Sequence, residues 1–479
     1  MTLKFSQPLA AHATPIPGVV LYDLPVHGDN RGWFKENWQR EKMAALGLPD
    51  FGPVQNNISF NESAGTTRGI HAEPWDKYIS VATGRIFGAW VDLREGPSFG
   101  TVFTAEMGPE TAIFIPRGVG NAFQTLEDNT AYTYLVNDHW SADAQGQYTF
   151  LNLADETAAV EWPIPLEEAE LSDKDRAHPR LAEVVPMAPK KILVLGADGQ
   201  LGRALRAAYA IDGPGGGRVE FASRADFDLG DPASFAARNW KNYSAIINAA
   251  AYTAVDAAET PEGRAAAWAV NAGAPARLAR VAGEHRIPLV QVSSDYVFDG
   301  TRGVHAEDEP FSPLGVYGQS KAAGDSAVSA VPAHYIVRTS WVIGEGANFV
   351  KTMASLAARG IAPSVVDDQV GRLTFTEDLA AGIRHLLDTG APYGTYNLTN
   401  TGPAMSWAEI AREVYRLTGA APEAVTGVST AEYFAGKTGV APRPLNSTLD
   451  LGKLEAAGFV PAPASERLEA YLHGSGAAL

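Results

Sequence analysis

The sequence predicts a two-domain protein, with an antiparallel β-sandwich or barrel first and a parallel sheet covered by helices second. A chain of 479 residues is too long for one ordinary hydrophobic core, and 46% hydrophobic with 19% charged residues is the composition of a globular protein. Short apolar runs broken by turn residues fill the first part, whereas strand-like and helix-like segments alternate in the second. The pattern changes near residue 180.

The strand-like runs of the first part are short and punctuated by Gly, Pro, Asn and Asp. They include residues 79–82, 86–91 and 131–136. Such spacing is typical of an antiparallel sandwich or barrel.

The second part alternates strands with helices. We expect strands over 191–195, 245–248 and 288–292, one helix from Leu201 and an Ala-rich helix over 264–282. This alternation favours a parallel sheet with helices on its faces. Between the two parts, the prolines and mixed polarity of residues 179–189 suit an extended linker. We therefore expect domains over 1–178 and 190–479.

Charge and composition exclude several classes of function. The 38 Lys and Arg against 55 Asp and Glu give a net charge of -17, which disfavours binding to nucleic acid or an anionic membrane. Cysteine is absent, which excludes disulfides and thiolate metal sites and is compatible with a reducing cytosol. The first residues lack the order of a signal peptide, and no apolar run is long enough to span a bilayer. We expect a cytoplasmic protein.

Three stretches of the second part together indicate a redox site. Tyr317 and Lys321 stand four residues apart, which is one helical turn, so the ammonium group favours ionisation of the phenol and helps it act as a proton donor. The hydroxyl of Ser294 can hold a substrate carbonyl. A Tyr-x-x-x-Lys pair alone also suits a solvated helical face.

The third stretch is a glycine loop that indicates a dinucleotide site. Gly196, Gly199 and Gly202 follow an apolar strand and open a helix, which lets the backbone approach a pyrophosphate, although a plain tight turn has the same pattern. The next strand ends at Ser223 and Arg224, where an NAD-preferring site often has an acid. Because Arg224 suits a 2'-phosphate, we expect NADPH, with NADH as the alternative.

The second part resembles the extended short-chain dehydrogenases, and within them the dTDP-4-dehydrorhamnose reductases. The resemblance rests on residues 248–259, 293–300, 316–321, 338–341, 348–349 and 368–371. It implies a Rossmann-type doubly wound sheet. It also implies that Ser294, Tyr317 and Lys321 act on a 4-keto sugar nucleotide, with Tyr317 protonating the new alkoxide.

This reductase resemblance implies two further sets of contacts. The expected cofactor contacts are Gly196, Gly199, Gln200, Leu201, Gly202, Arg224, Asp228, Ala250, Tyr317 and Lys321. The expected sugar-nucleotide contacts are Tyr252, Asp256, Trp341, Asn348 and Arg372. Trp341 equally suits a core position, and Arg372 a surface cation.

The first part contains the residue types of a proton-transfer enzyme. Epimerising a carbon next to a ketone needs a base, an acid and a group that stabilises the enolate oxygen. His71, Lys77 and Tyr134 are of those types. A lone histidine in a sandwich is also often structural, and no metal-ligand cluster is evident around it in the sequence, so we expect no metal site.

The first part resembles the dTDP-4-dehydrorhamnose 3,5-epimerases. The resemblance rests on residues 31–36, 55–57, 67–71, 91–94, 115–116, 134 and 171–175. It implies a cupin-like jelly roll that usually forms a homodimer. It also implies His71 as the base oriented by Asp175, Lys77 as the enolate stabiliser and Tyr134 as the acid. The implied substrate contacts are Arg31 and Arg68 on the diphosphate, Phe34 and Trp140 around the thymine, and Glu36, Gln55 and Asn57.

Several features depart from the two families' usual patterns. Ser294 stands where the reductases usually have Thr, and Trp140 stands where the epimerases usually have Tyr, and both replacements keep the chemistry of the side chain. The stretch between His71 and Lys77 is short, Glu73 stands where the epimerases usually have Gln, and Asn121 stands where they usually have His. In the reductase part, Leu373 replaces a Pro. A neutral amide at position 121 in place of an imidazole can alter which carbon is epimerised.

The two parts together predict a bifunctional enzyme. It would epimerise dTDP-4-dehydro-6-deoxyglucose at C3 and C5 and then reduce C4 with NADPH to give dTDP-L-rhamnose. The alternatives are epimerisation of a single centre, another nucleotide carrier, a reductase whose jelly roll serves only dimerisation, or a regulatory subunit. The sequence leaves open whether a divalent ion assists.

Overall fold

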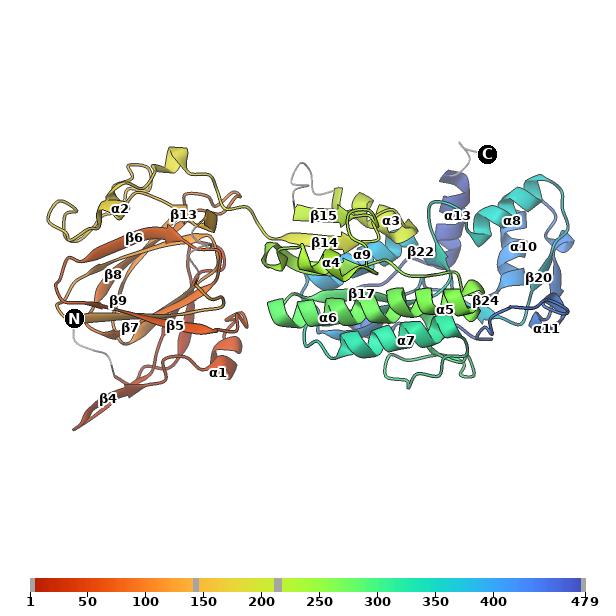
Figure 1. Ribbon diagram of the computed structural model, residues 1–479, viewed down its shortest axis with the longest axis horizontal. Helices are drawn as coiled ribbons and strands as arrows, with labels where there is room; N and C mark the ends of the chain where they lie inside the picture. The colour runs from red at the N-terminus through yellow and green to blue at the C-terminus, as the bar shows by residue number, and fades with distance from the viewer. Residues whose placement is uncertain (1–4, 141–145, 211–217, 475–479) are drawn as a thin grey trace. The chain divides into compact units, whose positions relative to one another are not determined.

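The computed structural model describes residues 5–140, 146–210 and 218–474. The chain divides into two compact units, Met1–Pro189 and Lys190–Leu479 (Figure 1). Within the described ranges, no helix combines the length and the apolar character needed to cross a membrane.

The first unit is an antiparallel sandwich, as the sequence predicts. One sheet has the strand order β1-β2-β10-β7-β12-β5, and the other has the order β13-β6-β11-β8-β9. The strands of the first sheet are β1 (Ala10–Ala13), β2 (Val20–Asp23), β10 (Thr111–Ile115), β7 (Lys77–Thr83), β12 (Thr130–Val136) and β5 (Gln55–Asn61). Those of the second are β13 (Thr149–Phe150), β6 (Thr67–Ala72), β11 (Val119–Thr125), β8 (Ile86–Asp92) and β9 (Val102–Met107).

Strand β8 shows how the second sheet is buried on both faces. Ile86 and Trp90 pack into the core shared with the first sheet, whereas the alternate residues Ala89 and Val91 pack against residues of the segment 151–187. Successive side chains of a strand point to opposite faces, so both faces of β8 need a cover. The segment after β13 provides the outer one.

Residues 179–189, which we expected to form an extended linker, belong to this outer layer. Leu181, Val184 and Met187 are buried in the cluster on the outer face of the second sheet, and a short 3-10 turn spans Leu181–Glu183. The prolines and mixed polarity were right for an irregular segment, but its apolar residues seal the sheet instead of leaving an extended connection. The first compact unit therefore runs to Pro189.

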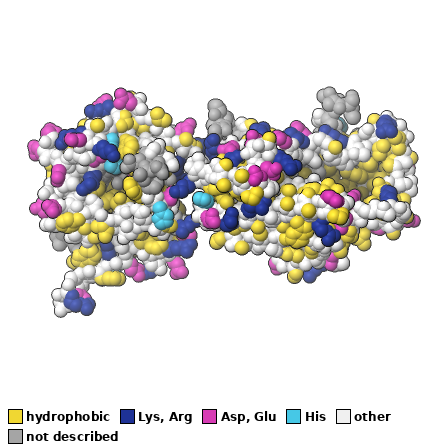
Figure 2. Space-filling view, in the orientation of Figure 1, with side chains coloured by type: hydrophobic (Ala, Val, Ile, Leu, Met, Phe, Trp, Pro, Cys, Tyr) yellow, Lys and Arg dark blue, Asp and Glu magenta, His cyan; other side chains and the backbone are white. Residues whose placement is uncertain are grey.

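A hairpin of β3 (Val26–Asp29) and β4 (Gly32–Lys35) projects from the sandwich (Figure 1). It is joined to the sandwich by Lys35, whose Nζ donates to the carbonyls of Val81 and Pro109 at 2.8 Å each. Two short helices complete the unit, α1 (Arg40–Ala44) and α2 (Asp173–Arg176). Charged side chains of both signs are spread over its visible face (Figure 2).

The second unit is a parallel sheet with the order β15-β14-β16-β17-β18-β23, which confirms the predicted doubly wound class. Its strands are β14 (Lys191–Leu195), β15 (Val219–Ala222), β16 (Tyr243–Asn248), β17 (Leu289–Ser294), β18 (His334–Thr339) and β23 (Gly394–Asn397). The chain leaves β14 in one direction to reach β15 and then returns to place β16 on the other side. Ligands of such sheets bind outside the carboxyl ends of the strands at this reversal.

Helices cover both faces of the parallel sheet. Leu193, Ile246 and Leu289 pack with residues of α6 (Ala274–His285) and α7 (Val316–Ser329), and Val194, Ile247 and Val290 pack with α3 (Gln200–Ala210) and α9 (Thr376–Asp388). Alternate residues of each buried strand thus face different helices. Two helices, α4 (Pro232–Ala236) and α5 (Pro261–Trp268), precede α6, and a π-helical turn at Ala269–Gly273 joins α5 to α6.

A smaller lobe packs around α8 (Phe349–Ala358), α10 (Trp407–Leu417) and α13 (Ala464–Gly474), which share one apolar cluster. The remaining short strand pairs are β19 (Val342–Ile343) with β22 (Thr374–Phe375), β20 (Ser364–Val366) with β25 (Thr426–Val428), and β21 (Val370–Gly371) with β24 (Met405–Ser406). The remaining helices are α11 (Thr430–Tyr433) and α12 (Gly452–Ala456).

Candidate active sites

The first unit brings His71 and Asp175 together from positions far apart in the chain. Nε2 of His71, on β6, lies 2.9 Å from Oδ1 of Asp175, on α2. Ser172 caps α2 by accepting from the Asp175 amide, which fixes the start of the helix. Burial raises the pKa of Asp175, but the hydrogen bond and charge of His71 outweigh burial and hold that pKa below its usual value. With Nε2 facing Asp175, the ring presents Nδ1 on its other side.

His178 is a neighbour of this pair that the sequence did not single out. Its ring lies edge-on to His71 with centroids 5.3 Å apart, and it stacks on Phe150 at 4.7 Å. Burial and the adjacent His71 lower its pKa, which favours a neutral ring. The ligand atoms of His71, Asp175 and His178 lie within 4.8 Å of one another. The 2.9 Å contact is that of a hydrogen-bonded dyad, and we assign no metal to it.

Lys77 and Tyr134 meet on neighbouring strands of the first sheet. Nζ of Lys77, on β7, lies 5.2 Å from the centre of the Tyr134 ring, on β12, and the Lys77 side chain is only 6% exposed. Burial and the negative charge of Glu73 raise the pKa of Tyr134, and Arg68 opposes them. Tyr134 therefore keeps its proton near neutral pH.

Aromatic contacts connect the dyad to this lysine. Phe150 touches His71 edge-on at 5.6 Å and Tyr148 at 5.8 Å, and Tyr148 touches Trp75 at 5.5 Å. The Nε1 of Trp75 donates to Glu73, which pairs with Lys77. A chain of side-chain contacts thus links the predicted base His71 to Lys77 and Tyr134.

The expected substrate contacts of the first unit are more dispersed. Arg68 donates to Asn61, and Gln55 donates to Asn57 and accepts from the Trp140 amide. Three others lie on or next to the projecting hairpin: Arg31 pairs with Asp29, Phe34 is 67% exposed, and Glu36 pairs with Lys42. Among the described residues, none of these three forms a hydrogen bond or an ion pair with His71 or Asp175, and their roles stay predictions.

Asn121 occupies a position inside the sandwich. Its Oδ1 accepts from Trp90 Nε1 at 2.9 Å, and its Nδ2 donates to the Tyr132 hydroxyl at 3.0 Å. Tyr132 in turn lies 5.7 Å from the Tyr134 ring. The amide therefore supports the strand that carries the proposed acid.

The second unit has a cavity of about 780 Å³ at the carboxyl ends of its parallel strands. It is lined by the glycine loop, by the residues that follow β16 and β17, and by α7. Ser294, Tyr317 and Lys321 all line it, so the structure brings the predicted redox residues into one place. The cavity lies where the sheet order predicts a ligand.

Hydrogen bonds and burial define the chemistry of this cavity. Ser294 Oγ donates to Asp295 Oδ1 at 2.8 Å, and Lys321 Nζ donates to the Val292 carbonyl at 2.6 Å. Burial raises the pKa of Tyr317 to about 12, and a hydrogen bond with Ser294 opposes the rise. Burial lowers the pKa of Lys321 to about 8, against the charge of Asp325. Burial also raises the pKa of Asp295 to about 6.

The glycine loop packs so closely against neighbouring backbone that side chains cannot replace two of its glycines. A Cβ on Gly196, whose φ is +82°, would lie 2.8 Å from the Ala250 nitrogen, and one on Gly202 would lie 2.3 Å from the Gly196 carbonyl oxygen. Gln200 also lies here, with a buried Oε1 for which the described residues supply no hydrogen-bond partner. Leu201 of the same turn lines the cavity.

Arg224 and Asp228 occupy different places near the glycine loop. Arg224 lines the cavity with an 89% exposed side chain, which leaves its guanidinium accessible to an anion. Asp228 accepts from the Gly230 amide at 2.8 Å and lies 3.8 Å from Arg224. Asp228 is not among the residues that line the cavity, and its cofactor contact stays a prediction.

The expected sugar contacts of the second unit divide into two groups. Trp341 lines the cavity and stacks on Trp407 at 3.8 Å, and Tyr252 packs in the same cluster as Tyr317. The others hold the fold together. Asp256 accepts from Arg443, Asn348 caps α8, and Arg372 donates to the carbonyls of Gly402 and Leu449.

Trp407 is a cavity residue that the sequence analysis missed. It begins α10, more than sixty positions after Trp341, and only their stacking brings both indoles to the cavity. Leu373 is buried in the smaller lobe.

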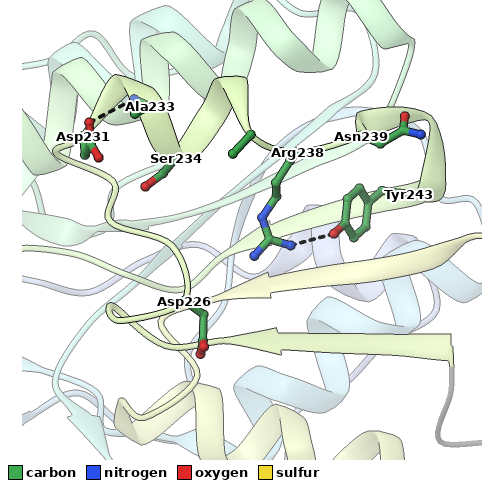
Figure 3. A pocket seen from close by; sticks show the side chains of 8 residues that line it. Asp226, Asp231, Ala233, Ser234, Arg238, Asn239 and Tyr243 are labelled. Carbon is green, nitrogen blue, oxygen red and sulfur yellow. Dashed lines mark hydrogen bonds between the residues drawn. The ribbon is translucent and has the colours of Figure 1, made fainter.

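A second hollow of about 600 Å³ lies beside α4 (Figure 3). Arg238 and Tyr243 line it, and Arg238 Nη1 donates to the Tyr243 hydroxyl at 2.6 Å. Arg238 also pairs with Glu220. None of the predicted site residues lines this hollow, and its one guanidinium is already engaged.

Comparisons with known proteins assign both units. Residues 13–183 match the dTDP-4-dehydrorhamnose 3,5-epimerase family, and residues 190–475 match the RmlD substrate binding domain. The chain belongs to both families. It therefore joins an epimerase domain to a reductase domain and is a bifunctional enzyme.

Individual relatives agree with this assignment. The RmlC homolog of Streptococcus pyogenes is 48% identical over 194 residues, which are 39% of this chain and 98% of that protein. The dTDP-4-dehydrorhamnose reductase of Mycobacterium tuberculosis is 39% identical over 282 residues, which are 57% of this chain and 88% of that protein. The crystal structure of a Bacillus anthracis dTDP-4-dehydrorhamnose reductase in complex with NADP has a TM-score of 0.54 at 32% identity, covering 60% of this chain and 99% of that one.

Proposed function

We propose that the chain converts dTDP-4-dehydro-6-deoxyglucose into dTDP-L-rhamnose, first by epimerisation at C3 and C5 and then by reduction at C4. The observation that carries the proposal is the presence of both complete sets of proton-transfer and redox side chains in a chain that belongs to both families. Epimerisation next to a ketone is close to thermoneutral, so the reduction draws the intermediate forward.

In the epimerase domain, His71 Nδ1 removes the proton from the carbon next to the ketone. Asp175 holds the ring through Nε2 and stabilises the imidazolium that forms. The electrons of the broken C–H bond move into the enolate, whose oxygen the Lys77 ammonium stabilises. Tyr134 then donates its proton to the opposite face of the same carbon, which inverts the centre.

In the reductase domain, Ser294 and Tyr317 hold the C4 carbonyl oxygen. NADPH supplies the hydride when bound. Tyr317 gives its proton to the developing alkoxide, and the nearby Lys321 charge lowers the cost of forming the phenolate. The glycine loop accommodates the pyrophosphate, and the exposed Arg224 holds the 2'-phosphate that distinguishes NADPH from NADH.

Product formation tests the whole proposal. The purified chain is given the ketone with NADPH, and cofactor oxidation is followed by absorbance while the product is identified by NMR. We expect dTDP-L-rhamnose, with epimerisation lost in His71→Ala and reduction lost in Tyr317→Phe. Absence of cofactor oxidation, or unchanged overall turnover of His71→Ala, would refute it. The ring-proton couplings of the product also decide whether one or both centres are inverted.

We also propose a homodimer formed through the sandwich. Ile58 and Phe60 point outward from β5, the strand that ends the first sheet, and they are 70% and 56% exposed. An edge strand with apolar outward residues favours association. Light scattering of the wild type and of Ile58→Asp/Phe60→Ser tests this, with a monomeric wild type as the refuting result.

A further inference from the structure

Glu73 occupies a buried position beside the lysine of the epimerase domain. It follows β6 directly, and its side chain is 11% exposed. Its carboxylate pairs with Lys77 Nζ and accepts from Trp75 Nε1 at 2.8 Å. The Glu73 carboxylate therefore accepts a hydrogen bond from the Trp75 indole and forms an ion pair with the Lys77 ammonium group.

The loop that carries Glu73 is fixed at both of its ends. The Glu73 carbonyl accepts from the Gly118 amide at 3.0 Å. At the other end, Asp76 accepts from the Arg117 amide at 2.8 Å and from Asn137 Nδ2 at 2.9 Å. The short stretch between His71 and Lys77 thus presents the carboxylate in one defined position.

A carboxylate at this position does what the amide of a glutamine cannot. A buried ammonium group is costly unless a counter-charge lies beside it. Lys77 is 6% exposed, and Glu73 is the acid that pairs with it in the described residues. An ammonium has three donors, so Lys77 can keep Glu73 and still donate to an enolate oxygen.

We propose that Glu73 is a positioning residue of the epimerase, which holds the Lys77 ammonium group toward the substrate ketone. This inference rests on the proposed epimerase function.

The groups that face Glu73 define the expected pH effect. They are Lys77 on β7, Tyr134 and Tyr132 on β12, and Tyr148 before β13. Burial raises the pKa of all three tyrosines, and the Glu73 charge raises them further. Arg68 acts on Tyr134 in the opposite sense. Removing the Glu73 charge therefore lowers the pKa of Tyr134.

The test compares Glu73→Gln, Glu73→Asp and a matched control in the full chain. The control is Glu110→Gln, which removes a buried carboxylate from the ion pair with Arg85 elsewhere in the same sandwich. Solvent deuterium exchange into the ketone measures epimerisation as a function of pH. The Tyr134 signal of [4-¹³C]tyrosine-labelled protein, assigned with Tyr134→Phe, follows its ionisation without any need for turnover.

We expect Glu73→Gln to lower kcat by about tenfold, with KM unchanged or lower, because the enolate forms only after binding. Its alkaline limb and the Tyr134 titration should both move to lower pH, because the Glu73 charge raises the pKa of Tyr134. Glu73→Asp should keep the wild-type Tyr134 titration, and Glu110→Gln should change neither property. An unshifted Tyr134 titration in Glu73→Gln, or a raised KM with wild-type kcat, overturns the inference. A wild type without exchange refutes the proposed function instead.

Discussion

Asp175→Asn isolates what the carboxylate behind His71 contributes to epimerisation. Asp175 is buried, and its Oδ1 lies 2.9 Å from His71 Nε2. When His71 takes the substrate proton, two unit charges at this distance attract by about 6 kcal/mol at an effective dielectric constant of 20. A charge-assisted hydrogen bond is worth about 1.5–3 kcal/mol net. Between these limits we expect a loss of about 3–4 kcal/mol, or roughly 10²–10³-fold in rate.

The comparison is cleanest at neutral pH. The pKa of Asp175 lies below its usual value because the hydrogen bond and charge of His71 outweigh burial. The negative charge of Asp175, and the stability that it contributes, is therefore fully present above the ordinary pKa of an aspartate. That contribution is lost only as the pH falls through the lowered pKa. At pH 7 the assay therefore compares an ionised group with a neutral isostere.

Solvent deuterium exchange into the ketone, without NADPH, measures this loss directly. The second domain supplies an internal control, because Asp175→Asn should reduce a separately epimerised ketone at the wild-type rate. An exchange rate within threefold of the wild type, with the reductase intact, would refute the role given to the dyad.

Three further substitutions test the reductase domain. Lys321→Met should lower the rate of reduction at least 100-fold. Burial lowers the pKa of Lys321 to about 8, so the free energy of unfolding of the wild type should rise by up to about 3 kcal/mol between pH 8 and 10.5. Denaturant unfolding of Lys321→Met should show no such rise. Burial raises the pKa of Asp295 from 3.8 to about 6, so Asp295→Asn should be more stable than the wild type at pH 7 by at most about 3 kcal/mol. This difference should vanish below about pH 4. Equal stability of the two proteins at pH 7 would contradict the prediction. Arg224→Ala should raise KM for NADPH about tenfold or more and leave KM for NADH unchanged; equal effects on both cofactors would remove the 2'-phosphate assignment.

The sequence predicted the elements of the second unit well because their signals are local. Strand β14 coincides with the apolar run at 191–195, and α3 begins at Gln200, within one residue of the expected start. The helix expected over 264–282 is divided by a π-helical turn at Ala269–Gly273. The Ala-rich composition of the segment is uniform and did not predict this turn.

The segment after β13 was harder to predict because its role depends on a partner surface. Leu181 and Met187 are isolated apolar residues among prolines, which is also what a linker contains. Their burial depends on the outward side chains of β6 and β8, which need a cover. The order of residues near positions 181–187 does not indicate that an apolar face from a distant part of the chain will cover them.

The amino-acid sequence by itself determined the two fold classes, the family of each half, and the types of residue that move protons and hydride. These follow from short-range periodicity and from motifs whose members stand close together in the chain. Only the tertiary structure decided that His178 lies beside His71, that Trp407 stacks on Trp341, and that Glu73 pairs with Lys77 instead of facing solvent. The strength of each contact depends on distance and burial, and both are properties of the packed chain.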